Sequence, residues 1–260
     1  MKKIILTLLA SLLITNVAKA EISGAVGVDF SKNASGDVIA TKDIDVIISS
    51  DEGFASINVI TDANDQLTLD EYSLGVNHAK GTLSYGDQGD IFIGGGLEVV
   101  GANTIENPSD DGESIILTYN KTSVRAKFTD TGSDVTDFDT VQATHYVTLG
   151  KLEAGVSVDH TIETDDNIWA LSGAVDLNET VSLSTVATYD DTNTTDEIGY
   201  ETIISADKVS AFFDGSDDDS LQNVGAGYKS TYKSVDWYIE AGYNLDSKDV
   251  TPAAGVSVNF

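Results

Sequence analysis

The chain has 260 residues, with 43 acidic side chains against 14 basic ones and a formal charge of −29 at pH 7. Such a charge disfavours nucleic acids and anionic lipid surfaces as partners and favours cations. There is no cysteine, so a disulfide scaffold is excluded and the fold must hold by hydrogen bonding and packing. Strong acidity with few aromatic residues can also indicate disorder, but the alternation described below argues against that interpretation.

The first 20 residues have the make-up of a secretory signal peptide. A basic start is followed by an apolar run, Ile4–Ile14, which is too short for a membrane-spanning helix, and then by Ala18–Ala20. We therefore predict cleavage between Ala20 and Glu21. Three of the chain's lysines lie in the removed segment, so residues 21–260 keep 11 basic against 43 acidic side chains, a formal charge near −32.

From Glu21 onward, apolar and polar residues alternate with the period of two that is typical of strands with unlike faces. Ile22, Val26 and Phe30, for example, alternate with Ser23 and Asp29. Segments of about ten alternating residues separated by turns are expected of outer-membrane strands. Roughly sixteen such segments are present by our count, with Leu83–Tyr85 as a short fifth, and an even number suits a bacterial barrel. The later segments are Val141–Leu149, Leu152–Ile162, Trp169–Leu177, Val181–Tyr189, Ile198–Ala206, Val209–Phe213, Val224–Tyr232, Val235–Leu245 and Ala254–Phe260.

The connections between these segments also alternate in length and charge. One set is tight and often contains a lysine (Lys80, Lys121, Lys151, Lys208 and Lys233), whereas the other set is longer and acidic. Short inner turns and long outer loops are typical of outer-membrane barrels. Aromatic residues on the apolar faces near strand ends resemble interfacial girdles; they are Trp169, Tyr189, Tyr200, Tyr232, Trp237, Tyr243 and Phe260.

The stretch Gly86–Glu113 is the longest part of the chain without strand alternation. Loops longer than about 12–15 residues in a compact domain are usually functional or disordered. We predict that this third external loop folds into the barrel lumen and narrows it, with Gly94–Gly96 allowing a sharp bend. The acids predicted to line the constriction are Asp90, Glu98, Glu106, Asp110, Asp111 and Glu113.

Basic residues on polar strand faces are candidates for the opposite side of this constriction. Arg125 and Lys127 alternate with apolar residues, so both point to the polar face, and Lys229 does the same on a later strand. A basic wall opposite the loop acids would set up a transverse field of the kind that gives pores their selectivity. The alternative is that Arg125 and Lys127 pair locally with acids of the barrel wall.

Residues 73–92, SLGVNHAKGTLSYGDQGDIF, are similar to the strand–turn–strand that precedes the constriction loop of the Gram-negative porin family, and residues 113–130 resemble the hairpin that follows that loop. The resemblance to the family is spread over most of residues 21–260. The terminal Phe260 resembles the signal by which bacterial barrels reach their assembly machinery. The resemblance implies a 16-stranded transmembrane barrel, usually a homotrimer, through which small hydrophilic solutes diffuse. Unlike the family's arginine clusters, this chain has a single arginine.

The sequence therefore predicts an outer-membrane diffusion channel that prefers cations. An alternative of a different class is a secreted or surface β-sandwich adhesin that buries its apolar strand faces and binds through its acidic loops. No pairing of a nucleophile with a base indicates an enzyme, and no cofactor is predicted. The acidic run Asp214–Ser220 lacks the spacing of an EF-hand loop, so no metal site is predicted.

Overall fold

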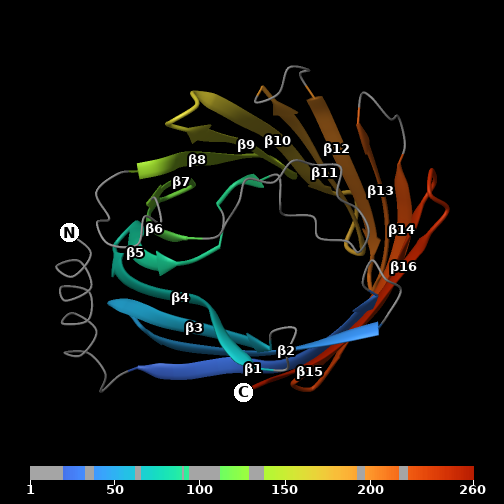
Figure 1. The fold of residues 1–260 in the computed structure, drawn as a ribbon, viewed down its shortest axis with the longest axis horizontal. Helices are drawn as coiled ribbons and strands as arrows, with labels where there is room; N and C mark the ends of the chain where they lie inside the picture. The colour runs from blue at the N-terminus through green and yellow to red at the C-terminus, as the bar shows by residue number, and fades with distance from the viewer. Residues whose placement is uncertain are drawn as a thin grey trace.

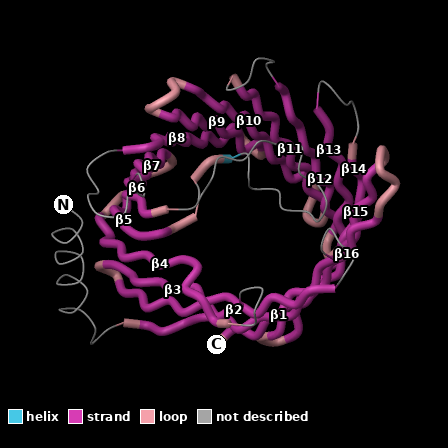
Figure 2. Tube along the Cα trace, in the orientation of Figure 1, coloured by secondary structure: helices cyan, strands magenta, loops and turns pink. Residues whose placement is uncertain are grey.

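The computed structural model describes residues 20–32, 38–61, 66–89, 91–93, 112–128, 138–191, 197–216 and 222–260. These residues form sixteen strands: β1 (Glu21–Lys32), β2 (Val38–Ser50), β3 (Gly53–Thr61), β4 (Leu67–His78), β5 (Gly81–Asp87), β6 (Glu113–Tyr119), β7 (Thr122–Phe128), β8 (Phe138–Leu149), β9 (Leu152–Thr161), β10 (Asp166–Asp176), β11 (Val181–Asp190), β12 (Glu197–Ala206), β13 (Val209–Ser216), β14 (Asn223–Tyr232), β15 (Val235–Asn244) and β16 (Val250–Asn259). Each strand pairs antiparallel with its sequence neighbours, and β1 pairs with β16, so the sheet closes into a ring (Figure 1 and Figure 2). The predicted antiparallel barrel of sixteen strands is confirmed.

The seam between the first and last strands is tied at the end of the chain. Gly24 donates its N–H to the carbonyl of Phe260 at 3.1 Å, and Phe260 donates its N–H to the carbonyl of Gly24 at 3.0 Å. Pro252 lies within β16 opposite Ala241 of β15, but the pairing of β16 with β1 ends at Ala253. The proline therefore stands where β16 has only one neighbour, which suits a residue that cannot donate to a ladder.

Two-residue turns gather at one rim of the ring. The turns that begin at Asn120, Gly150, Asp207 and Lys233 each start with a positive φ, between 53° and 67°. Hairpin turns that match the twist of the flanking strands require a positive φ at this position, and Asn, Asp and Gly are the residues that accept it most readily. We call this end of the barrel the tight-turn rim. Asp51–Glu52 and residues 177–180 turn at the same rim.

Apolar side chains cover the outside of the barrel instead of filling a core. Ile22 is 67% exposed and Leu171 is 63% exposed, and six of the seven predicted girdle aromatics, all except Tyr200, are also exposed. The side chains that are buried on the inner face are mostly polar; they include Arg125, Gln142, Asp159, Glu201 and Asp214. This distribution is the reverse of that in a soluble protein, so the β-sandwich alternative, which buries the apolar faces, is wrong. Among the described residues, no helix is long and apolar enough to cross a membrane.

The barrel wall is tightly packed around Gly225 and open around Gly173, which yields a stability prediction. A Cβ on Gly225 would lie 2.0 Å from Cε1 of Phe212 and 2.5 Å from the carbonyl oxygen of Ala241, whereas a Cβ on Gly173 would meet nothing closer than 3.9 Å. We expect Gly225→Ala to destabilise the barrel by about 1–3 kcal/mol through overpacking. The midpoint temperature of the heat-induced gel-mobility shift should fall for Gly225→Ala and stay unchanged for Gly173→Ala. Equal midpoints for the two variants would contradict this account of the wall.

Candidate functional site

After β5 the chain turns onto the inner wall of the barrel instead of continuing directly into β6. Figure 1 and Figure 2 show the described residues 88–89 and 91–93 inside the ring. Thr144 on β8 donates its hydroxyl to the carbonyl of Ile91 at 2.7 Å, and Ile93 donates its N–H to the hydroxyl of Ser157 on β9 at 3.1 Å. The hydroxyls of Thr144 and Ser157 are also hydrogen-bonded to each other. The strand face that bears Thr144 and Ser157 is therefore the inner one.

An apolar contact holds the same segment to the wall. Phe92 and Ile93 are 5% and 7% exposed, and they pack against Ala170 of β10 and Val186 of β11. Gly155 leaves room for this contact, because a Cβ there would lie 2.6 Å from Cδ1 of Ile93. The sequence analysis did not identify this contact. Its signal was present, because Phe92 and Ile93 are a large apolar pair within an otherwise acidic stretch.

Arg125 lies beneath the start of this connection and does not face open solvent. Its side chain is 1% exposed, and its guanidinium donates to the carbonyl of Gln88 at 3.1 Å. Gln88 is held in turn by the hydroxyl of Ser84 at 2.8 Å and by its own amide donating to the carbonyl of Ser114 at 3.3 Å. Arg125 thus contacts the backbone of the long connection. The loop acids that it was predicted to oppose, Asp90, Glu98, Glu106, Asp110 and Asp111, lie outside the described residues.

The other two predicted basic residues have different surroundings. Lys127 forms an ion pair with Asp139, with Nζ and Oδ2 3.5 Å apart, which is the local pairing with a wall acid that the alternative describes; its place in a basic wall stays a prediction. Lys229 is exposed on the inner face of β14, opposite Tyr238 and close to the tight-turn rim. Arg125 and Lys127 share one face of β7, but Lys229 lies on the far side of the ring, so the three do not form one cluster.

Glu113 lies in a strand, which corrects its placement among the loop acids. It is the first residue of β6 and pairs with Asp87 of β5. The predicted loop was therefore one residue too long at this end. Its carboxylate accepts hydrogen bonds from the hydroxyls of Tyr72 and Tyr85, the latter at 2.7 Å. Alternation along β6 puts Glu113 on the same face as Leu117, which is exposed on the outside. Glu113 therefore faces away from the lumen, and its predicted place among the acids that line the constriction is corrected.

Carboxylates line two arcs of the inner wall. On the arc of β1–β3, Asp29 accepts a hydrogen bond from the hydroxyl of Tyr238 at 2.8 Å, Asp45 accepts one from the amide of Asn58 at 2.5 Å, and Asp43 lies opposite Gly27. On the arc of β11–β14, Glu201 and Asp214 face each other across neighbouring strands.

Asp214 of the second arc is held by a chain of side-chain amides. Asp214 accepts a hydrogen bond from the side-chain amide of Asn223 at 2.8 Å, and Asn223 accepts one from Asn244 at 2.8 Å. Both arcs keep carboxylates on the polar face of an enclosed space. A water-filled interior costs less free energy than burying so many carboxylates in a dry core.

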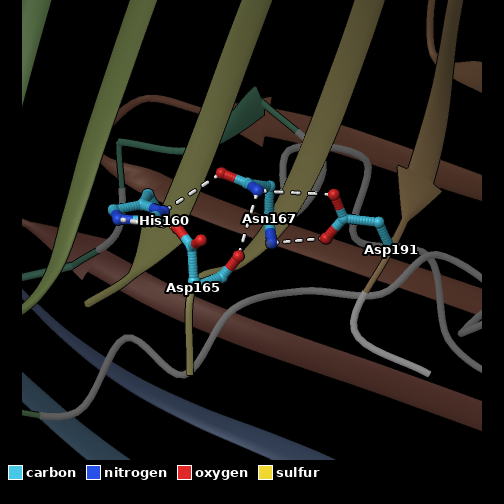
Figure 3. Close-up of polar contacts among 4 residues, drawn as sticks. All are labelled: His160, Asp165, Asn167 and Asp191. Atoms are coloured by element: carbon cyan, nitrogen blue, oxygen red, sulfur yellow. Dashed lines mark hydrogen bonds and ion pairs between the residues drawn. The ribbon is translucent and has the colours of Figure 1, made fainter. Parts of the chain in front are cut away.

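A polar network ties three strands together at the rim opposite the tight turns (Figure 3). Asn167 at the start of β10 donates its N–H to Asp191 at 2.5 Å and its side-chain amide to the same carboxylate at 3.3 Å. His160 of β9 lies 3.1 Å from the amide oxygen of Asn167 and 4.0 Å from the carboxylate of Asp165. The network fixes the β9–β10 hairpin against the end of β11. In the described ranges, no group of three or more His, Asp or Glu residues has the arrangement of a metal site.

A closed ring of sixteen strands with an apolar outside, a polar inside and an inner segment after β5 has the architecture of a porin barrel. Solved porin structures match it. A mutant of the Rh. blastica porin superposes with a TM-score of 0.65 at 12% identity, covering 93% of this chain and 100% of that one. Salmonella typhi OmpF, in complex with daunomycin, gives a TM-score of 0.64 at 12% identity, with coverages of 93% and 97%.

A third match is a loop-deletion mutant of OmpT, an outer membrane protein of Vibrio cholerae, with a TM-score of 0.60 at 11% identity and coverages of 93% and 99%. At these identities the likeness concerns the fold. No protein-family model and no curated protein matches the sequence.

Arg125 provides a test of how the inner segment is held. We expect Arg125→Gln to loosen residues 88–93, because a neutral side chain replaces the guanidinium that donates to the carbonyl of Gln88. The variant should lower the midpoint of the heat-induced gel-mobility shift and make residues 88–93 more accessible to protease. Lys229→Gln, which removes the same charge from an exposed site, is the control and should change neither. If Arg125→Gln leaves both the midpoint and the protease resistance of the segment unchanged, Arg125 does not hold the segment.

Proposed function

We propose that this protein is an outer-membrane channel for passive diffusion of small hydrophilic solutes and ions. The observation that carries the proposal is the closed barrel whose exposed apolar side chains face outward while its acids face inward. Lipid tails suit the outer face, and water suits the inner one. The likeness to solved porins supports the same function. Such diffusion needs neither a catalytic residue nor a cofactor, and we propose neither.

The acidic inner wall supports a preference for cations. The arcs of β1–β3 and β11–β14 add carboxylates to a chain that already has a large negative charge. Charged walls in a narrow, low-dielectric channel concentrate counter-ions and repel ions of like charge. Cations should therefore permeate more readily than anions.

The segment on the inner wall supports a constriction by the rest of the long connection. Residues 91–93 already lie against β8–β11, so the chain enters Gly94–Gly96 from within the ring. Acids at 90, 98, 106, 110 and 111 would then narrow the lumen and add to its negative charge. This arrangement would strengthen the preference for cations and limit the size of the solutes that pass through the lumen.

Export and assembly complete the proposal. Residues 1–20 would act as a signal peptide, and residues 21–260 would form the mature barrel in the outer membrane of a Gram-negative bacterium. The terminal Phe260 would be read by the barrel-assembly machinery, and the channel would work as a homotrimer. The described strands begin at Glu21, directly after the proposed cleavage site.

Conductance in planar bilayers tests the function directly. Purified, refolded protein should insert in steps of uniform conductance, and a KCl gradient should give a reversal potential of the sign expected for cation preference. An anion-selective pore would keep the channel and overturn the role given to the wall acids. Folded, inserted protein without conductance would contradict the channel itself.

The wall acids of β1–β3 yield a sharper prediction. We expect the triple variant Asp29→Asn, Asp43→Asn and Asp45→Asn to lose a large part of the cation preference, because it removes three charges from the inner wall. The loss should be greater at 0.1 M salt than at 1 M, since the Debye length falls from about 10 Å to about 3 Å. Reversal potentials at both salt concentrations measure it.

A matched control removes three exposed charges from the tight-turn rim: Asp51→Asn, Glu52→Gln and Glu179→Gln. This variant should keep most of the preference. Equal effects of the two triple variants would show that net charge, and not the position of the acids on the wall, sets selectivity.

A further inference from the structure

Aromatic and basic residues lie together on the outside of the barrel at the tight-turn rim. Tyr228, Tyr232 and Trp237 are exposed there on β14 and β15, and Tyr232 reaches 70% exposure. The rings of Tyr228 and Trp237 lie 5.2 Å apart between centroids. Lys208 comes from the turn between β12 and β13, and Lys233 comes from the turn between β14 and β15. We call these five residues the Lys208–Lys233 patch.

Both ammonium groups lie beside the aromatic surface. Lys208 donates from Nζ to the hydroxyl of Ser230 at 3.0 Å, and Ser230 is the cross-strand partner of Trp237. Alternation along β14 places Ser230 on the same outward face as Tyr228 and Tyr232. The Nζ of Lys233 lies 5.5 Å from the ring centroid of Tyr232. The positive charges therefore stand on the outer surface and not at the pore mouth.

Among the described residues, no carboxylate forms an ion pair with this patch. Asp236 is the nearest acid on β15, but alternation turns it to the inner face, where it accepts hydrogen bonds of 2.5 Å from Thr231 and from Asn259. Within the described part of the chain, neither Lys208 nor Lys233 has a carboxylate oxygen within the 4.0 Å of an ion pair. Lys208 uses one of its three N–H donors on Ser230, which leaves two for a ligand.

We propose that the Lys208–Lys233 patch binds the phosphate of an anionic phospholipid in the surrounding leaflet. The two ammonium groups bind the headgroup phosphate, and the acyl chains lie along Trp237 and the exposed Ile239 and Val256 beside it. Aromatic residues at the level of the headgroups, with lysines just beyond them, are the usual arrangement at a membrane interface.

This site rests on the proposed function, because only a membrane barrel presents its outer face to lipid. It also refines the expectation that the acidity of the chain disfavours anionic lipid surfaces as partners. Charges further apart than a Debye length, about 8 Å at physiological salt, are largely screened. A headgroup at the patch therefore responds to the two nearby lysines more than to the distant acids of the lumen.

The chain contains two tryptophans, which makes the site measurable. Trp237 belongs to the patch, whereas Trp169 is exposed on the outside near the opposite rim, three residues after the start of β10. Trp169→Phe leaves Trp237 as the one tryptophan of the chain, and Trp237→Phe leaves Trp169. Each variant is reconstituted into vesicles that contain phosphatidylglycerol or phosphatidylcholine with brominated acyl chains, which quench a tryptophan in contact with them.

At low salt we expect brominated phosphatidylglycerol to occupy the surface beside Trp237 about threefold or more in preference to phosphatidylcholine. Beside Trp169 the two lipids should quench equally. The preference at Trp237 should vanish in 1 M salt and in the variant Lys208→Gln with Lys233→Gln. It should persist in Lys80→Gln with Lys151→Gln, which removes two exposed lysines from other turns of the same rim.

The outcomes separate the site from the function on which it rests. Equal quenching of Trp237 by the two lipids would overturn the lipid site and leave the membrane barrel in place. A preference that survives Lys208→Gln with Lys233→Gln would also overturn it, because the lysines would not be the ligands. If neither lipid quenches either tryptophan, the membrane placement fails and the site fails with it.

Discussion

Closure of the β1–β16 seam is the constraint on which the rest of the structure depends. Lipid offers no hydrogen bonds to an exposed strand edge, so a sheet can cross a membrane only as a closed ring. Gly24 and Phe260 exchange backbone hydrogen bonds at the end of the chain, which extends the seam to the last residue. Once the ring is closed, alternation along each strand leaves one face for lipid and one for water, and the positions of the apolar and acidic residues follow from it.

The fold could be predicted from the sequence because the alternating period of two is repeated sixteen times. The ends of individual strands were less predictable, because residues near the rims are polar on both strand faces and the alternation of apolar and polar residues is lost there. Val209–Phe213 was predicted, for example, but β13 continues to Ser216 because Asp214 and Ser216 pair as inner-wall residues. Asp214 is buried among amides that come from β14 and β15, and a sequence pattern cannot show contacts between separate strands.

The candidate site was predictable in its position but not in its contacts. The length and acidity of the stretch after β5 identified it as the exceptional connection, and residues 91–93 do lie on the inner wall. The alternation along the strand correctly put Arg125 on the inner face. It could not show that the connection would cover Arg125, because alternation gives the direction of a side chain and not the residues that pack over it. For the same reason, alternation could not show that Lys127 of β7 would form an ion pair with Asp139 of β8.

Residues 91–93 are attached to the inner wall by contacts that do not depend on opposite charges. Residues 86–113 contain no lysine or arginine, and among the described residues no ion pair joins residues 86–93 to the wall. The structure uses two other means. One is the apolar contact of Phe92 and Ile93; the other is a pair of hydrogen bonds, in which Thr144 donates its hydroxyl to the carbonyl of Ile91 and Ser157 accepts the N–H of Ile93. Arg125 adds a positive charge at the base of the connection, where burial strengthens its interaction with a carbonyl. A single arginine at this point therefore helps to hold the described start of the connection on the inner wall.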